Sequence, residues 1–581
     1  MSKRFASEAL EDLDVGSPAS KRFRSEAPSD MTGTEENGDD TIIAQNHNNH
    51  RPHPLANSAS PEADSSGEGE DDDEMSDAPP IHSAPLRQSA PTAGYDDLYL
   101  DTIDRQILDF DFEKLCSVSL SNINVYACLV CGRYYQGRGS KSHAYFHSLD
   151  EDHHVFINME THKVYVLPEG YEVNSKSLDD IKFVSDPRYT REDVSQLDKK
   201  PLGAFALGGK KEYVPGFVGM NNIKENDYLN VVVQSLSHVS PLRNYFLLED
   251  FTSNNELVKR TSLLIRKIWN PRAFKTHVSP HELLQEISLK SNKRFTLTHQ
   301  SDPVDFLSWY LGNLHLSLGG SRSKPQSSIV QSIFQGKLHV ESQSITATTA
   351  LSNPNSTSSN SLRDPSRLRF EPSAEVSTET TRFMLLTLDL PPAPLFQDEQ
   401  ERNIIPQVPL IQLLGKYDGV RAQEHLAQRK RYKLMHPLPP FLCFHIKRFS
   451  KNKFVAERNP TIVVFDPKGL DISPFVQGQG GGAGAEGGGP IYYDLVANIV
   501  HEAVRAKDDV GDSGEEKKSW KVQLLDKGRD EWVVCQDLFV EKAQRELLYL
   551  GESYLQVWER RRAPTTQSCG GKGKKGKARR A

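Results

Sequence analysis

The chain has 581 residues, 25% of them charged, and its formal net charge of -8 at pH 7 excludes a general nucleic-acid binder. No apolar run approaches the roughly 20 residues that a membrane-spanning helix needs, so we predict no membrane association. Six cysteines over this length are too few for a disulfide framework and favour a reducing intracellular compartment.

Residues 1–95 differ in composition from the rest of the chain. Ser, Pro, Asn, Asp and Glu dominate, and Glu68–Asp77 is rich in acidic side chains. Such a segment cannot bury enough apolar surface to offset the entropy cost of ordering, so we predict a disordered tail. Two basic clusters in it, Lys3-Arg4 and Lys21–Arg24, have a spacing compatible with a bipartite nuclear import signal, which indicates the nucleus.

A cluster of cysteines and histidines follows between residues 96 and 200. Cys128 and Cys131 are separated by two residues, the spacing of a chelating knuckle, and several histidines come after them. Two thiolates and two imidazoles complete a tetrahedral Zn²⁺ site. The block resembles the ubiquitin-protease type of zinc finger. This resemblance implies one structural zinc ion with the ligands Cys128, Cys131, His147 and His153, and it leaves His143 and Cys116 as alternatives.

Some zinc fingers of this type grip the free C-terminus of ubiquitin with aromatic and Arg side chains. Arg133 and Tyr134 are the candidates for that role here. Some proteases of the family also carry a second zinc site built from two Cys-x-x-Cys knuckles, and no such knuckle follows Cys131. Ubiquitin binding is therefore not favoured, and one ion is expected.

The segment Gly219–Gln234 has the layout of a cysteine-protease nucleophile box without a cysteine. It resembles the first signature box of the ubiquitin-specific proteases, Gly-Leu-x-Asn-Leu-Gly-Asn-Thr-Cys-Tyr-x-Asn-Ser-x-Leu-Gln, with Asp227 on the nucleophile position. A carboxylate is a weak acyl-transfer nucleophile, so we expect Asp227 instead to cap a helix over residues 228–238. Glu225 replaces the oxyanion-stabilising Asn and would repel the developing negative charge. The residues shared with the box are Gly219, Asn222, Tyr228, Asn230 and Gln234.

Four further segments resemble later boxes of the family, in the family's order. Residues 300–307 resemble the box that opens a core helix, and residues 439–449 alternate like a half-buried strand. Residues 461–465 are the usual companion of that strand, and residues 493–501 resemble the strand Tyr-x-Leu-x-Ala-x-x-x-His. The resemblance implies an α+β, papain-like ubiquitin-specific protease fold over residues 212–562, preceded by the small zinc-binding α/β finger over residues 96–200.

The other catalytic positions are also changed. Ser519 aligns with the family's general base, and a hydroxyl cannot carry a proton at neutral pH as an imidazole does. Gln536 aligns with the orienting Asp or Asn, and no histidine follows His501 in the chain. Cys443 lies in an apolar run and is expected to be a small buried hydrophobe, while Cys535 has no histidine near it in sequence. The chain is therefore predicted to be a pseudoenzyme without the Cys/His/Asp triad.

Three low-complexity stretches lie outside these boxes. Ser342–Ser366 is rich in Ser, Thr and Asn and predicts a loop insertion, and Gly478–Gly489 predicts a flexible insertion. Residues 563–581 form a basic tail that is expected to be disordered and to make at most a weak or indirect contact with RNA.

The combination of finger and altered boxes resembles the inactive, ubiquitin-protease-like splicing factors. That resemblance implies a non-catalytic scaffold in nuclear pre-mRNA splicing that supports assembly or stability of the U4/U6·U5 tri-snRNP. The implied partners are spliceosomal snRNP proteins. The alternative interpretation is a residual deubiquitinase or a ubiquitin-binding reader.

Overall fold

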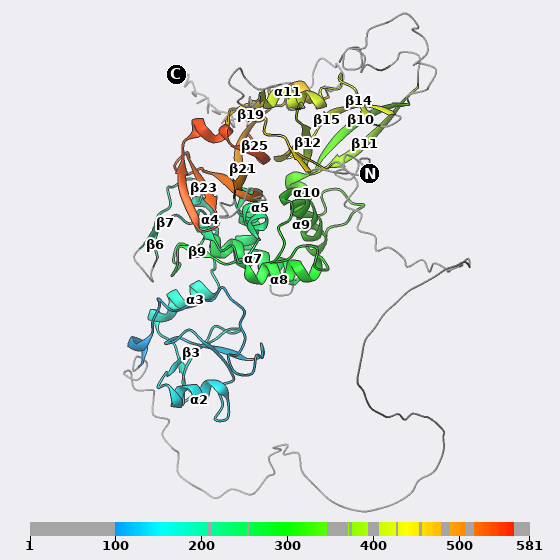
Figure 1. Ribbon diagram of the computed structural model, residues 1–581. Helices are drawn as coiled ribbons and strands as arrows, with labels where there is room; N and C mark the ends of the chain where they lie inside the picture. Colours follow the sequence, from blue (N-terminus) through cyan, green and yellow to red (C-terminus); the bar gives the residue numbers. More distant parts are fainter. Residues whose placement is uncertain are drawn as a thin grey trace, which may run out of the picture. The chain divides into compact units, whose positions relative to one another are not determined.

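We analysed the protein as a computed structural model (Figure 1). The structure describes residues 99–206, 211–251, 255–344, 370, 375–392, 406–425, 428–451, 456–477, 489–505 and 516–562. The predicted tail 1–95, most of the glycine tract and the basic tail 563–581 lie outside these residues. Among the described helices, none combines the length and apolar character that crossing a bilayer requires.

The first folded region is a five-stranded antiparallel sheet with the order β2-β1-β3-β4-β5. Both faces of its central strands are covered, because Val125 and Ala127 of β1 join one apolar cluster while Tyr126 and Cys128 join another. Ala144 of helix α2 packs in the second cluster. The elements are β1 (Val125–Cys128), β2 (Tyr134–Gln136), α2 (His143–Asp150), β3 (Val155–Asn158), β4 (Val164–Val166), β5 (Glu172–Val173) and α3 (Asp179–Ser185). Helix α4 (Arg191–Gln196) follows, and its buried Val194 belongs to the apolar cluster of the second folded region.

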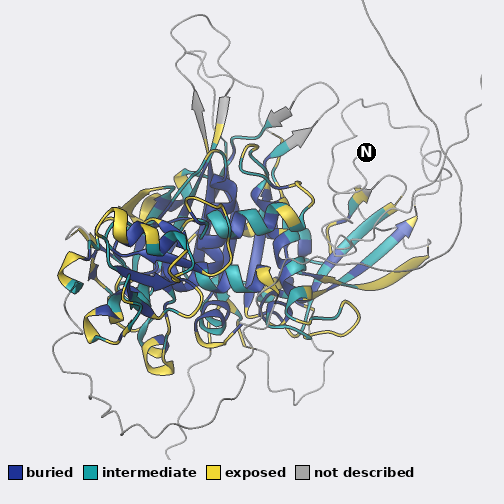
Figure 2. Ribbon diagram, turned by 90° about the horizontal axis from the view of Figure 1, so that it is seen from below, coloured by how far each residue is buried: buried dark blue, intermediate teal, exposed yellow. Residues whose placement is uncertain are grey.

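The second folded region begins with a group of helices around α5 (Asp227–Ser237). Every residue of α5 is buried, so this helix lies in the interior and its first turn is shielded from water. Figure 2 shows the buried segments gathered at the centre and the exposed ones at the periphery. The surrounding helices are α6 (Ser240–Leu248), α7 (Glu256–Ile268), α8 (His281–Lys290), α9 (Pro303–Ser317) and α10 (Ile329–Phe334).

An eight-stranded sheet packs against these helices, with the order β12-β16-β25-β21-β22-β23-β24 and β20 paired to β21. Helix α5 contacts β21, β22 and β23 of this sheet, which brings its N-terminus to the C-terminal part of the chain. The strands are β12 (Leu386–Asp389), β16 (Phe441–Lys447), β20 (Leu470–Asp471), β21 (Tyr492–Arg505), β22 (Glu516–Asp526), β23 (Glu531–Gln536), β24 (Phe539–Ala543) and β25 (Glu552–Arg560).

A separate four-stranded sheet has the order β11-β10-β15-β14. It consists of β10 (Gly336–Ser344), β11 (Val376–Phe383), β14 (Gln423–His425) and β15 (Gln428–Met435). The remaining elements are short: β6 (Ala204–Phe205), β7 (Glu212–Tyr213), β8 (Gly219–Met220), β9 (His277–Val278), β13 (Gln407–Pro409), α11 (Leu410–Leu414), β17 (Phe449–Lys451), β18 (Ala456–Arg458), β19 (Ile462–Val464) and the 3-10 turns η1 (Leu100–Thr102), η2 (Lys176–Leu178), η6 (Gly415–Tyr417), η7 (Ser473–Phe475) and η8 (Arg545–Leu550).

The structure agrees with most of the local predictions and corrects two of them. The helix expected over residues 228–238 is α5, and the strand expected within residues 439–449 is β16. Asp227 is not the cap, because the helix begins at Asp227 itself and Asn226 holds the cap position. The loop predicted from Ser342 is also wrong at its start: β10 pairs with both neighbours through Ser342, and residues 345–366 lie outside the described part.

Candidate functional site

The first candidate site lies at the N-terminus of α5, where Asp227 is only 5% exposed. Its carboxylate accepts hydrogen bonds from Gln300 Nε2 at 2.9 and 2.8 Å, from Trp520 N at 3.3 Å and from Tyr228 N at 2.9 Å. Burial raises the pKa of the Asp227 carboxyl, and these hydrogen bonds oppose the rise. The side chain is thus engaged by three segments of the chain.

Ser519 and Gln536 lie beside this carboxylate, on strands β22 and β23. Gln536 Nε2 donates to Ser519 Oγ at 2.9 Å, and the residue after Ser519 is Trp520, whose backbone N–H bonds to Asp227. The structure therefore brings together the three positions that the sequence aligned with a catalytic triad. A carboxylate, a hydroxyl and an amide at these positions include neither a thiolate nucleophile nor an imidazole base.

Glu225 is held by the loop that precedes α9. Its carboxylate Oε2 accepts from Gln300 N at 3.1 Å, and its own N–H donates to Leu297 O at 3.1 Å. Gln300 therefore links the two acidic residues, with its backbone to Glu225 and its side chain to Asp227. A site with two acidic side chains at this point would disfavour an oxyanion.

Asp537 is a residue of this region that the sequence interpretation missed. It follows β23 with a positive φ of 50°, and its carboxylate accepts from Asn222 Nδ2 at 3.0 Å and from Asn230 Nδ2 at 3.2 Å. Its carbonyl accepts from Met220 N at 2.7 Å. A signal was present in the sequence, because Asn222 and Asn230 match the first box and the buried amide of Asn230 needs a partner.

The two cysteines of the larger region are unsuited to a nucleophilic role. Cys443 is 1% exposed and Cys535 is 0% exposed, which confirms the prediction of a buried side chain for Cys443. Burial raises the pKa of each thiol to about 12, so both remain neutral at physiological pH.

The second candidate site is a cluster of metal-ligating side chains in the first folded region. Cys128 ends β1, Cys131 lies in the turn after it, His147 is on α2 and His153 follows that helix. One ligand atom from each of these four residues lies within 4.8 Å of all the others. The turn is tight because Gly132 N donates to Cys128 O at 2.9 Å, and Gly132 has a φ of 73°, which favours glycine.

The donor set fits a zinc ion. Bond lengths of about 2.0–2.3 Å place the ligand atoms of one tetrahedral zinc roughly 3.3–3.8 Å apart. Here His147 Nε2 lies 3.4 Å from Cys131 Sγ and 3.1 Å from His153 Nδ1. The hydrogen bond between Cys131 and Cys128 lowers the pKa of the Cys131 thiol and raises that of the Cys128 thiol, so it favours one of the two thiolates that the metal would bind. Among the described residues, the alternatives His143 and Cys116 are not part of this cluster.

Tyr134, a candidate for gripping a ubiquitin C-terminus, is occupied. Its hydroxyl donates to Asp109 O at 2.9 Å, and the side chain is 9% exposed within the apolar cluster of the first region. Tyr134 is therefore not available to a bound peptide, whereas the other candidate, Arg133, is exposed.

Two family models match the chain. The model described as ubiquitin carboxyl-terminal hydrolase matches residues 218–561, and the model described as a zinc finger in ubiquitin hydrolases and other proteins matches residues 116–178. The first match covers the region around Asp227, and the second contains the four-residue metal cluster.

Several curated proteins are similar over most of their length. A protein named probable mRNA-splicing protein ubp10, from Schizosaccharomyces pombe, is 49% identical over 80% of this chain and 88% of its own. The pre-mRNA-splicing factor SAD1 of Saccharomyces cerevisiae is 32% identical over 80% and 93%. A crystal structure described as that of an essential yeast splicing factor aligns with a TM-score of 0.62 at 31% identity, covering 80% of this chain and 100% of that chain.

Proposed function

Because this chain belongs to the ubiquitin carboxyl-terminal hydrolase family, and its triad positions hold Asp227, Ser519 and Gln536, we propose that it keeps the fold as a non-catalytic scaffold in nuclear pre-mRNA splicing. The observation that supports a non-catalytic role is the hydrogen bonding of Asp227. Its carboxylate is tied to Gln300 and Trp520 at the position where a free thiolate would be required.

The rate losses that follow removal of catalytic groups support the absence of peptidase activity. The members of a catalytic triad act as a unit, and loss of one removes roughly 10⁴-fold or more in rate. Loss of an oxyanion donor costs about 10²–10³-fold further. Several of these groups are replaced here, so binding without turnover is what remains.

The splicing role rests on the names of the relatives, which are splicing proteins in two yeasts. By analogy, this chain supports assembly or stability of the U4/U6·U5 tri-snRNP, and snRNP proteins are its partners. The two basic clusters of residues 1–95 would bring it to the nucleus. Any RNA contact would be weak and would come through the tail 563–581.

We assign two folded domains, a zinc finger over residues 96–200 and a hydrolase-like domain over residues 212–562. The family matches fall within these limits. The finger would hold one structural Zn²⁺ through Cys128, Cys131, His147 and His153. Zinc bound by four protein ligands would cross-link β1, its turn and α2, and it would leave no open position for catalysis.

The catalytic part of the proposal is tested by incubating the purified full-length protein with ubiquitin conjugates and with an electrophilic ubiquitin probe, beside an active member of the family. We expect neither cleavage nor adduct for the natural chain or for Asp227→Cys, since the base and the oxyanion donor stay absent. Turnover above that of a boiled sample would support a residual deubiquitinase instead.

The splicing part is tested by depletion and rescue. Asp227→Asn, which keeps the size of the side chain, should restore splicing and co-purify snRNP proteins, whereas Cys131→Ser should do neither. Failure of a folded, normally abundant Asp227→Asn protein would mean that the altered cleft is itself functional. Recovery of free ubiquitin without snRNP proteins would favour a ubiquitin reader.

A further inference from the structure

Residues 103–114, which we call the strap, precede β1 and belong to the finger's own core. Leu108 and Phe110 are buried in the apolar cluster of the finger, and the same cluster contains Phe274, from the loop before β9 of the hydrolase-like domain. The strap also bonds to the metal-binding turn, since Asp104 N donates to Leu129 O at 3.2 Å. The two domains therefore share an apolar cluster through this segment.

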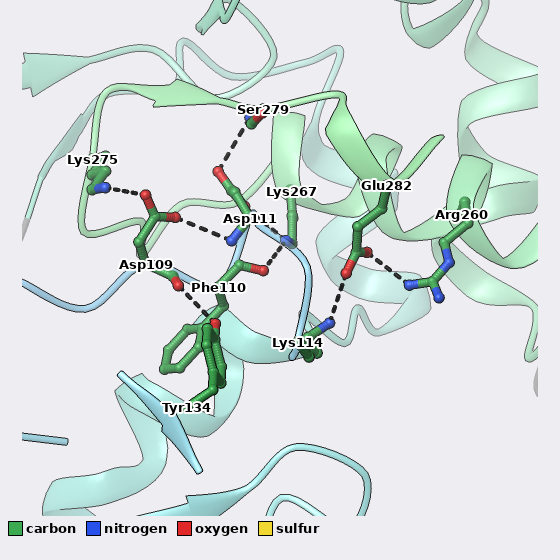
Figure 3. Close-up of polar contacts among 10 residues, drawn as sticks. All are labelled: Asp109, Phe110, Asp111, Lys114, Tyr134, Arg260, Lys267, Lys275, Ser279 and Glu282. Carbon is green, nitrogen blue, oxygen red and sulfur yellow. Dashed lines mark hydrogen bonds and ion pairs between the residues drawn. The ribbon is translucent and has the colours of Figure 1, made fainter. Parts of the chain in front are cut away.

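The other side of the strap is bonded to the end of α7 and the loop after it (Figure 3). Lys267 Nζ, on a side chain 8% exposed, donates to Asp111 Oδ1 at 2.7 Å and to Phe110 O at 2.9 Å. Asp111 Oδ2 accepts from Ser279 N at 3.2 Å, and Lys275 pairs with Asp109. Burial alone would lower the pKa of Lys267, but the carboxylates around it, Asp111 first, raise the pKa. These carboxylates therefore stabilise the charged form of Lys267.

The strap's last residue makes a reciprocal contact with α8. Lys114 Nζ pairs with Glu282 at 3.1 Å, and Arg260 of α7 pairs with the other oxygen at 2.8 Å, as drawn in Figure 3. The Glu282 side chain is 13% exposed. Burial alone would raise the pKa of Glu282, but the neighbouring cations, Lys114 first, lower it. Each domain therefore contributes a lysine that pairs with a carboxylate of the other domain: Lys267 with Asp111, and Lys114 with Glu282.

A second contact comes from α3 and the segment that follows it in the chain. Arg272 lies over the ring of Phe183 at 5.2 Å, and Tyr189 OH donates to Arg266 O at 2.7 Å. Asp186 lies 3.7 Å from Arg266. The C-terminal half of α7 and the loop that follows it are therefore contacted by the segment before the finger's sheet and by the segment after it.

We propose that the docking partner of this zinc finger is the hydrolase-like domain of its own chain, with the strap as a charge-paired fastener between them. Buried charges tolerate little displacement, because each unpaired charge in a dry contact is strongly unfavourable. The fastener fixes one orientation of the two domains. A binding partner would then contact one surface formed by both domains. Binding or loss of zinc in the finger would also affect α7 and α8. This inference does not depend on a role in splicing.

Hydrogen–deuterium exchange of the full-length, zinc-loaded protein tests the fastener. Lys267→Met keeps the aliphatic stem and removes the charge, and we expect at least tenfold faster exchange in both residues 103–114 and residues 274–279, with zinc content unchanged. Lys163→Met is the matched control, because Lys163 forms an exposed ion pair with Glu172 at 3.0 Å within the finger. Exchange equal to that of the control would overturn the proposal.

Two further experiments, a second substitution and removal of zinc, test the same proposal. If Lys267→Met does not fold, Asp111→Asn breaks the same contact from the strap and should give the same pattern of faster exchange. Removing zinc from the natural chain with a chelator should speed exchange in α7 and α8 at least tenfold. Exchange in those helices that is unaffected by chelation would show that the finger and the hydrolase-like domain are independent, and would refute the fastener.

Discussion

The side-chain amide of Gln300 donates to both carboxylate oxygens of Asp227, at 2.9 and 2.8 Å, and also to Lys518 O at 2.9 Å. The Gln300 amide therefore bonds the carboxylate that stands where a cysteine protease of this family would carry its nucleophile. It ties α5 to the loop before α9 and to β22. The acidic residue that removes the chemistry is at the same time a structural bond between distant parts of the chain.

The stability of this contact can be measured by replacing either partner. Gln300→Ala and Asp227→Ala should each lower the free energy of unfolding by about 1–3 kcal/mol, because a buried polar group loses its partner. Chemical denaturation of the full-length protein gives the values. Gln412→Ala, at an exposed position of α11, is the control and should change stability by less than about 0.5 kcal/mol. Equal effects at the two glutamines would contradict the structural role.

His238 predicts a dependence of stability on pH. Burial lowers its pKa to about 4, its side chain lies among buried groups, and its Nε2 has no hydrogen-bond partner. The unfolded chain binds a proton near pH 6.5 and the folded chain does not, so stability is lost as the pH falls from about 6.5 to about 4. His238→Gln should flatten the pH profile of the unfolding free energy by up to about 3 kcal/mol over this range. His299→Gln, at an exposed position, is the control substitution.

Elemental analysis should find one zinc ion for each full-length chain. Cys131→Ser should lose the ion and unfold the finger, because a closed zinc site contributes directly to the folding of a small domain. The hydrolase-like domain has large apolar clusters of its own and should stay folded, melting at a lower temperature. Cys116→Ser is the control, and it should retain the metal. A count of zero, or of two or more, would contradict the assignment.

The thiols of Cys443 and Cys535 should resist modification in the folded protein. Each has a pKa that burial raises to about 12, so only about three thiols in 10⁵ are ionised near pH 7.5, and neither is accessible. Mass mapping after brief exposure to a maleimide should find both unlabelled, and both labelled once the same sample is denatured. Rapid labelling of either residue in the folded state would reopen the possibility of a displaced nucleophile.

Features that depend on residue identity and short spacing could be predicted from the sequence. The Cys128-x-x-Cys131 turn and the alternating apolar residues of β16 are local patterns, because a chelating turn and a strand each need only a few neighbouring residues. The absence of a histidine after His501 is likewise a property of the sequence alone. The Cys-x-x-Cys spacing predicted the cluster of metal ligands, whereas the fold and the altered triad were implied by the resemblance of five ordered segments to the boxes of the family.

Contacts between residues far apart in the chain could be seen only in the folded protein. Local propensity favours Asp227 as a helix cap, but Gln300 and Trp520, 73 and 293 residues away, draw its carboxylate to them instead. The contact of Asp111 with Lys267 spans 156 residues and has no local signature. Such pairs are selected by burial, since a charge removed from water must find a partner wherever the fold provides one, and only the folded chain shows which partner that is.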